Sequence, residues 1–436
     1  MKPWALVALT AGIVSAGLAI CGSNAPPPQK ADMQKAEQWN LVVSGSTDGY
    51  LSPCGCTSPM TGGIRRRATA IGGIEAKGKV VFIDTGGLAA VPGVQGQYKV
   101  ETMAQSLAKM GAAAVALTAE DLRLGPNATQ AEIGLAAGRI VSTTLSGAQK
   151  NGVGSGAFEG VVASIERGPF LIGATTDTRS LSSGAGISDV AAARLLVSLA
   201  EDRGKLPVLM LDAGHDDAVR IARTVPNLVA VVYRQSGWPP DRLERVGSVA
   251  LLTPGERGKA IIQLTFGGTA ITGYRSIRLG PEFKDDPSVS RYFKGYLSRV
   301  DAAHLLEQQP RQSAAGFTGS EECGKCHGAA EEVWRHSGHF HAYDTLEKQG
   351  QARDPDCVSC HVVGLDREDG FRSRELTPGL SSVGCESCHG AGAAHAASPK
   401  TAHFKEVTDA TCISCHRAEQ SPGFDFQTYL KKIAHK

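Results

Sequence analysis

The stretch CGKCH at residues 323–327 is the first of four copies of one pattern; CVSCH at 357–361, CESCH at 385–389 and CISCH at 412–416 follow it. Each copy supplies two thiols, which can add across the vinyl groups of a haem, and a directly following histidine that can bind the iron. One copy would be a moderate signal, because C-x-x-C also occurs in zinc and thioredoxin-like sites. A zinc site has no use for a histidine after every second cysteine, so four copies predict four covalently bound haem c groups.

The expected role of each residue follows from its position within the motif. The cysteines that form thioethers are Cys323, Cys326, Cys357, Cys360, Cys385, Cys388, Cys412 and Cys415. The histidines that bind iron from the proximal side are His327, His361, His389 and His416.

The surrounding segment, residues 317–436, is rich in Cys, His, Gly and polar residues and has no apolar pattern long enough for an ordinary core. Four haems leave about 30 residues for each, too few to enclose every cofactor separately. The haems must therefore form the core of a mainly α-helical, multihaem cytochrome c domain. Haems packed that closely can pass electrons along a chain, and their ligands and burial tune each potential.

Four stretches of this segment resemble the tetrahaem cytochrome c family, whose best-known member carries electrons from hydroxylamine oxidation in ammonia-oxidising bacteria. They read CGKCH with VWRHSGHFHAYDTL, DPDCVSCHVVG, VGCESCHGAGAAH, and CISCH with FDFQTYLKKIAH. The resemblance implies that His339, His395 and His435 are distal iron ligands. His341 and His403 are further candidates. If neither reaches the fourth iron, that haem keeps an open position for a small ligand such as nitric oxide or nitrite.

Upstream, residues 39–280 alternate short β-branched runs with helical patterns. The runs include LVVSGS, VVFIDTGG, AAAVALT, RIVSTTL, LPVLMLDAG and LVAVVY. In one helical pattern, apolar residues recur at helical spacing before Gly111: Val100, Met103, Leu107 and Met110. These patterns predict an α/β domain with a substantial sheet. The polar, Pro-containing stretch 281–316 has helical periodicity in its middle and is expected to be a connector.

The α/β region resembles the nucleotidase-type, calcineurin-like metallophosphatases, whose fold is a two-sheet sandwich flanked by helices. The resemblance rests on the order of LVVSGSTDGYLSP, GGIRRRATAIGGI, VVFIDTGG, MGAAAVALTAEDLRLG and LPVLMLDAGHDDAVRIARTVPNLVAVV. A working member of that class holds two metal ions with histidines, aspartates and an asparagine, because both ions must clamp the attacking and leaving oxygens.

Most of these metal ligands are missing from the sequence. The expected Asn-Asp-x-His-Gly reads STDGY at 46–50, Gly-Asn-His-Glu reads TAED at 118–121, and Gly-His-x-His reads RQSG at 234–237. Asp84 is kept, but Gly87 stands in place of its partner aspartate. The first 303 residues contain only one histidine, His215, and one imidazole cannot build a dinuclear site. We therefore expect an inactive scaffold, with residual phosphoesterase activity in a bifunctional protein as the alternative.

A cysteine pair and an arginine run lie near the beginning of this region. Cys54 and Cys56 form a PCGC stretch, which fits a redox pair, a thiol pair for copper or another soft metal, or a structural pair. A bridge across that separation would be strained and easily reduced. The run from Arg65 to Arg67 is expected to be a solvated turn rather than an anion site.

The beginning of the chain, residues 1–20, has a basic start and an apolar stretch typical of a secretory signal peptide. LAIC at 18–21, followed by GSNAPPPQK, resembles a bacterial lipoprotein box, so Cys21 would be acylated and residues 21–38 would form a tether. Ile20 departs from the usual small residue, and a plain exported protein or an uncleaved apolar anchor is the alternative. Each interpretation places the chain in the periplasm or at the cell surface.

Composition narrows the range of partners. Charged residues make up 20% of the chain and its net charge is +2, with no long run of one sign, so nucleic-acid binding is not indicated. We expect an electron carrier rather than an enzyme: an exported, lipid-anchored tetrahaem cytochrome that moves electrons between redox protein donors and acceptors in the cell envelope. Self-association of copies is left open. The alternative is a haem redox enzyme that acts on a small nitrogen compound at a five-coordinate haem.

Overall fold

The structure is a computed structural model of the chain and describes residues 37–53, 59–136, 138–145, 160–178, 186–404, 406–417, 421 and 423–435. The expected signal peptide, nearly all of the tether, Cys21, Cys54 and Cys56 lie outside the described residues. Residues Gln38–Lys436 form one compact unit. Because this unit contains both the sandwich and the haem-motif segment, the domain boundary expected at 281–316 stays a prediction from sequence.

Two six-stranded sheets make up the described part of the N-terminal region. In spatial order, the first sheet contains β12 (Ala270–Arg278), β11 (Ala260–Gly267), β1 (Gln38–Ser44), β2 (Lys79–Asp84), β3 (Ala114–Ala116) and β4 (Ile140–Val141). The second contains β5 (Ser164–Arg167), β6 (Phe170–Ala174), β7 (Leu206–Leu211), β8 (Ala230–Tyr233), β10 (Val249–Leu252) and β9 (Glu244–Val246). Strands β1 to β4 are parallel, as are β6, β7, β8 and β10, and the remaining strands pair antiparallel at the edges.

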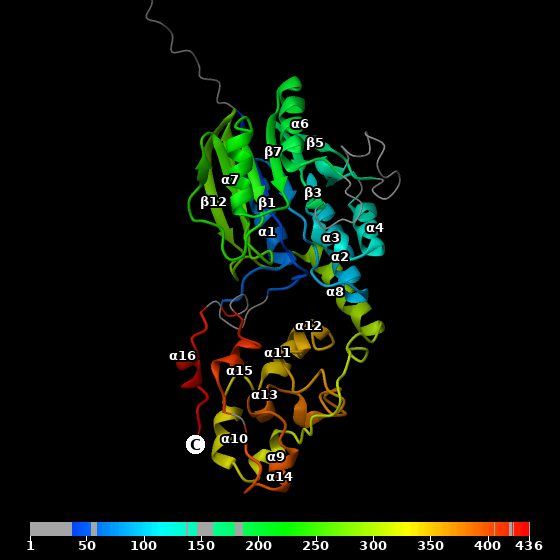
Figure 1. Cartoon of the computed structure of the whole chain (residues 1–436), viewed down its shortest axis with the longest axis vertical. Coiled ribbons are helices and arrows are strands. Elements are labelled where there is room, and N and C mark those ends of the chain that lie inside the picture. The colour runs from blue at the N-terminus through cyan, green and yellow to red at the C-terminus, as the bar shows by residue number, and fades with distance from the viewer. Residues whose placement is uncertain are drawn as a thin grey trace, which may run out of the picture. The chain divides into compact units, whose positions relative to one another are not determined.

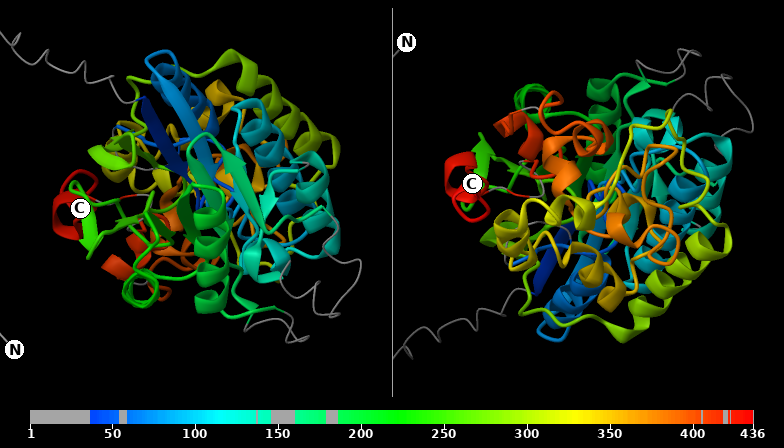
Figure 2. Two further views of the ribbon diagram at one scale, coloured as in Figure 1. Left: turned by 90° about the horizontal axis from the view of Figure 1, so that it is seen from above. Right: turned by 90° about the horizontal axis from the view of Figure 1, so that it is seen from below.

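The two sheets pack face to face and are covered by helices on their outer faces (Figures 1 and 2). Between the sheets lies an apolar layer in which Phe170 of β6 meets Phe266 of β11 with ring centroids 5.0 Å apart. Outside the first sheet lie α1 (Ile64–Glu75), α2 (Val94–Lys109) and α8 (Pro287–Ala302). Outside the second lie α6 (Asp189–Asp202) and α7 (His215–Thr224). This confirms the predicted α/β two-sheet sandwich.

Some helices and strands follow the sequence patterns closely, and others are shorter than the patterns predict. The helix predicted from Val100, Met103 and Leu107 is α2, and all three side chains are fully buried. The RIVSTTL run, in contrast, gives only the two-residue strand β4. After it, the Thr143 hydroxyl donates to the Ala163 carbonyl oxygen at 2.6 Å, and a short helical turn begins. Two further short helices, α3 (Ala119–Arg123) and α4 (Pro126–Leu135), follow β3.

Beyond α8 the described chain consists of short helices joined by irregular loops, drawn yellow to red in Figure 1. They are α9 (Ser320–Gly324), α10 (Gly328–Arg335), α11 (Ala342–Gln349), α12 (Pro355–Val358), η2 (Pro378–Leu380), α13 (Cys385–His389), α14 (Ala393–Ala397), α15 (Asp409–Ile413) and α16 (Phe426–Leu430). One small apolar cluster, from Leu306 to Leu380, includes Tyr343, Val358 and Phe371. The predicted helical character is confirmed, and most of this segment lacks an apolar core of its own.

Candidate haem sites and the sandwich edge

Each C-x-x-C-H motif forms a single helical turn. The His327 amide donates to the Cys323 carbonyl oxygen at 2.9 Å, and the His416 amide donates to the Cys412 carbonyl oxygen at 2.8 Å. One helical turn places residues three and four positions apart on the same side. The two thiols and the imidazole of a motif can therefore face one planar group, as covalent attachment and proximal ligation of a haem require.

Three of the four motif histidines, which are predicted to be proximal ligands, face a predicted distal histidine. Ring centroids are 6.1 Å apart for His327 and His395, 6.0 Å for His416 and His339, and 5.9 Å for His389 and His435. A metal–imidazole bond is about 2 Å, so two imidazoles on opposite sides of one ion have centroids roughly 6 Å apart. The residues present therefore fit three iron sites with a histidine on each side of the metal.

Hydrogen bonds orient several of these imidazole rings. Nδ1 of His395 bonds the Ala402 carbonyl oxygen at 2.7 Å, and Nδ1 of His435 bonds the Ile433 carbonyl oxygen at 2.9 Å. A carbonyl can only accept, so Nδ1 carries the proton and Nε2 is left as the metal-binding atom. Aromatic rings pack around the histidine pairs. The ring centroids of Phe404 and His395 are 4.6 Å apart, and Phe424 stacks on His416 with ring centroids 5.0 Å apart.

The fourth proximal histidine, His361, differs from the other three. Its Nδ1 donates to the Ala342 carbonyl oxygen at 2.6 Å, and burial lowers its pKa, which keeps the imidazole neutral. Within the described residues, no other histidine ring contacts it. The two further candidates are exposed: His341 bonds Asp344 at 3.1 Å, and His403 lies on the surface. The arrangement matches a haem whose sixth position takes no histidine.

A cavity of about 1920 Å³ is large enough to accommodate more than one haem. Its walls include Cys357, Cys360 and His361 of the second motif. The fourth motif contributes Cys412, Cys415 and His416, together with the opposing His339. The same cavity is bounded by side chains of the sandwich, including Tyr50, Lys99 and Arg257.

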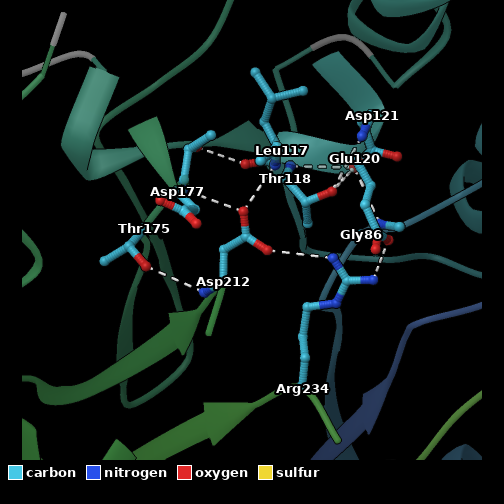
Figure 3. A network of polar contacts seen from close by, with 12 residues as sticks. Gly86, Leu117, Thr118, Glu120, Asp121, Thr175, Asp177, Asp212 and Arg234 are labelled. Carbon is cyan, nitrogen blue, oxygen red and sulfur yellow. Dashed lines mark hydrogen bonds and ion pairs between the residues drawn. The ribbon is translucent and has the colours of Figure 1, made fainter. Parts of the chain in front are cut away.

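In the sandwich, the four segments expected to carry metal ligands do meet at one edge, but arginines occupy its centre. Arg234 bonds Asp212 at 3.2 Å and forms an ion pair with Glu120 (Figure 3). Its guanidinium also lies 3.7 Å from the Asp48 carboxylate. Burial raises the pKa of Asp48 to about 7, although Arg234 opposes that shift. Asp121 accepts from the Gly87 and Leu88 amides at 3.0 and 2.8 Å. Sequence reasoning did not identify Asp212 or Arg234 as partners.

A second arginine holds the retained aspartate. Arg67 and Asp84 are fully buried and form an ion pair at 3.2 Å, and Arg67 also donates to Thr47 Oγ1 at 3.0 Å. Burial disfavours both charges, raising the pKa of Asp84 and lowering that of Arg67, and the pair offsets this cost. The expectation of a solvated turn at Arg65–Arg67 was therefore wrong. The run lies at the start of helix α1, and helical periodicity turns its third arginine into the interior.

Within the described residues, no group of three or more His, Cys, Asp or Glu side chains could hold a metal ion. His215 lies at the start of α7, where its Nε2 bonds Glu244 at 2.8 Å. At the sandwich edge, guanidinium groups neutralise the carboxylates in the way that bound cations would. The geometry is that of an internally compensated polar network.

Residues 322–390 match the family model described as cytochrome c554 and c-prime. This range contains three of the four C-x-x-C-H motifs. The chain is 35% identical over 103 residues to cytochrome c-554 of Nitrosomonas europaea, covering 20% of this chain and 44% of that protein. The chain thus spans less than half the length of this relative.

Solved structures resemble the chain in fold. A 5'-nucleotidase precursor from Thermus thermophilus has a TM-score of 0.51 and 18% identity, covering 72% of this chain and 68% of that one. The NAD nucleotidase of Haemophilus influenzae has a TM-score of 0.51 and 12% identity, covering 66% and 64%. The sulfate thiohydrolase SoxB of Thermus thermophilus has a TM-score of 0.50 and 14% identity, covering 70% and 68%. The chain therefore combines a segment with the sequence pattern of the cytochrome c554 and c-prime family with a domain that has the fold of the 5'-nucleotidases.

Proposed function

We propose that this chain is an exported tetrahaem c-type cytochrome that transfers electrons between redox partners in the cell envelope. The observation that carries the proposal is the set of three histidine pairs with ring centroids about 6 Å apart. Each pair joins a motif histidine to a histidine far away in the sequence. Three separate pairs of histidines at this spacing, each including a motif histidine, fit two imidazoles on opposite sides of one metal ion.

The order of the motifs in space supports electron transfer. A bound haem supplies an iron that alternates between two oxidation states and so carries one electron. The side chains of Cys323 and Cys385 are neighbours, as are those of Cys360 and Cys415. Cys388 lies near Cys412, and both line the same cavity. The motifs are therefore neighbours in the order first, third, fourth, second, with the His361 site at one end next to the sandwich.

The number of haems tests this proposal directly. Pyridine haemochrome analysis of the purified chain should give four c-type haems per polypeptide. Reversible reduction of all four by a small donor should follow in a spectroscopic titration. A count of two or fewer would contradict the proposal.

A second candidate function rests on His361 alone. An iron with one open position can bind a small nitrogen compound such as nitric oxide or nitrite, and that binding is the basis for a haem redox enzyme. Nitric oxide should change the electronic spectrum of one haem in the purified protein and leave three unchanged. Steady turnover of nitrite or nitric oxide with a reduced donor would favour the enzyme, whereas binding without turnover favours the carrier.

The sandwich is proposed to be a scaffold without phosphoesterase activity. The buried pair of Arg67 with Asp84 and the pair of Arg234 with Asp212 support this, because each places a fixed positive charge beside a carboxylate at the edge where metal ligands were expected. Nucleotide hydrolysis with added manganese, zinc or calcium should stay at background. Hydrolysis that is lost in Asp84→Asn would establish the bifunctional alternative.

Export and anchoring rest on the sequence of the first residues. No helix within the described residues is long and apolar enough to cross a membrane. Acylation of Cys21 would hold the chain at a membrane, so Cys21→Ser should move it to the soluble fraction after cell lysis. Retention of the Cys21→Ser protein in membranes would point to an uncleaved apolar anchor. Cys54 and Cys56 remain a proposed redox or soft-metal pair.

A further inference from the structure

Polar contacts from the sandwich and α8 converge on one short part of the haem segment, residues 351–356. Gln95 Nε2 of α2 donates to Asp354 Oδ1 at 2.8 Å, and the Tyr296 hydroxyl of α8 donates to Asp354 Oδ2 at 2.9 Å. Gln95 Nε2 also bonds the Tyr296 hydroxyl at 3.0 Å, which closes a three-membered network. This network is buried: Asp354 is 6% exposed and Tyr296 1%.

The same part of the chain leads directly into the second haem motif. Asp354 is the N-cap of α12 and accepts from the Asp356 amide at 3.1 Å, and α12 contains Cys357. Lys99 of α2 forms an ion pair with Asp356, and the Lys99 side chain is only 13% exposed. An N-cap bond fixes where a helix begins and how it points. The sandwich therefore fixes the helix that carries the first thiol of the His361 site.

A parallel contact reaches the Cys357 side chain itself. Gln351 Nε2 donates to Ser52 Oγ of the sandwich at 3.0 Å. Its other side-chain atom, Oε1, lies 3.5 Å from Cys357 Sγ. One glutamine thus connects the sandwich to a haem-attaching cysteine, while Tyr50 and Lys99 border the cavity that His361 lines.

The first and third motifs are held differently, by residues of the haem segment. Glu386 in CESCH accepts from the Gly319 amide at 2.9 Å and the Gly392 amide at 2.7 Å. Ser320 Oγ accepts from the Cys385 amide at 3.1 Å. These bonds join the two motifs to each other. The second motif is thus held by residues of the sandwich and α8, and within the described residues its histidine faces no second histidine ring.

We propose that the sandwich is a positioning domain for the His361 haem: through Gln95, Lys99 and Tyr296 it fixes α12, and so sets the ligand affinity of that one iron. Groups that orient metal ligands from outside tune the metal strongly. This inference rests on the proposed tetrahaem function and adds a role for a fold that has lost its own metal ligands. It assigns Gln95, Lys99 and Tyr296 as positioning residues.

The test changes only the sandwich side of the contact, which leaves the sequence of every haem motif intact. The variant combines Gln95→Leu, Lys99→Gln and Tyr296→Phe in the full chain. The control is Glu101→Gln, which breaks the 2.6 Å ion pair of Glu101 with Arg299 between the same two helices without touching residues 351–356. Nitric oxide affinity and the electron paramagnetic resonance spectrum are measured for both proteins and the wild type.

We expect the triple variant to change the dissociation constant for nitric oxide by about fivefold or more, the effect of losing one net hydrogen bond. Its three low-spin signals should stay as in the wild type, and Glu101→Gln should match the wild type throughout. An unchanged dissociation constant in a folded triple variant would overturn the positioning role. An equal change in Glu101→Gln would also overturn it, since the effect would then follow from general loosening of α2 and α8.

Two outcomes separate this inference from the proposed function. A wild-type chain with two or fewer haems would contradict the proposed function, and the positioning role, which depends on it, would fall too. A wild-type chain with four haems and one that binds nitric oxide, combined with no effect of the variants, would contradict the positioning role alone. If the triple variant does not fold, Tyr296→Phe replaces it, because phenylalanine keeps the buried ring and removes only the hydroxyl; an unchanged dissociation constant in that variant would count against the inference.

Discussion

In the sandwich, three clusters of buried apolar side chains fill the space between and outside the sheets. The described haem segment has one such cluster, and it ends at Leu380. This difference explains why the sandwich can lose metal ligands and keep its fold. In the haem segment the residues that we propose to bind the cofactor are also the residues around which the interior is organised, so we expect haem ligation and folding to depend on each other.

The largest effect should come from producing the chain without covalent haem attachment. Residues 381–435 should then lose protection from amide hydrogen exchange, because no apolar cluster in their described part replaces the cofactor. The sandwich strands β1, β2, β7 and β8 should stay protected. Hydrogen exchange followed by mass spectrometry checks both halves, and a protected C-terminal segment in the haem-free chain would show that the comparison between the regions is wrong.

Removing one distal histidine should change one haem and leave the sandwich as it is. His395→Ala leaves His327 without its opposing ring, so we expect a second high-spin signal in electron paramagnetic resonance. His403→Ala is the matched control, since His403 is exposed and opposes no proximal histidine. Identical spectra for His395→Ala and the wild type would remove His395 from the ligand set.

Within the sandwich, breaking the buried ion pair should be costly. Arg67→Met leaves the Asp84 charge buried without its partner, which should lower the free energy of unfolding by about 3–5 kcal/mol. Arg66→Met is the control, because Arg66 is half-buried and bonds only backbone carbonyls; it should cost about 1 kcal/mol. Denaturant unfolding followed by tryptophan fluorescence measures both. Equal small losses would mean that Asp84 is protonated and needs no partner.

A smaller change in stability, whose direction with pH can be predicted, is expected from Glu132 in α4. Both carboxylate oxygens are buried without a hydrogen-bond partner, and burial raises the pKa of Glu132 well above its usual value. The folded state binds this proton more tightly than the unfolded state, so its contribution to stability is full below the unfolded pKa and declines as pH rises toward the folded pKa. Glu132→Gln should therefore stabilise the chain at pH 7 relative to pH 4, by about 1–3 kcal/mol. Thermal unfolding at the two pH values measures this, and equal effects at both would contradict the assigned shift.

Much of the fold could be predicted because it depends on patterns among residues that are close in the sequence. Helix α2 follows from apolar residues at helical spacing, and the parallel strands follow from β-branched runs. The C-x-x-C-H turns are likewise local, since two thiols and an imidazole lie within five residues. The buried arginine was missed because the sequence gives the charge of Arg67 but not the position of Asp84 relative to it.

Other features depend on contacts between distant residues. The resemblance indicated His339, His395 and His435 as distal ligands, but the sequence could not assign each to a motif. The structure places His395 opposite the first motif, His435 opposite the third and His339 opposite the fourth. The contact of Gln95 and Tyr296 with Asp354 could not be predicted either, because hydrogen bonds between segments far apart in the sequence leave no periodic signal.

We propose that the chain carries three closed haem sites and one open site at His361. Quantitative electron paramagnetic resonance of the fully oxidised protein tests this arrangement, because spin state reports the number of strong axial ligands. We expect three low-spin haems and one high-spin haem per chain, with only the high-spin signal altered by nitric oxide. Four low-spin signals unaffected by nitric oxide, or more than one high-spin signal, would contradict it.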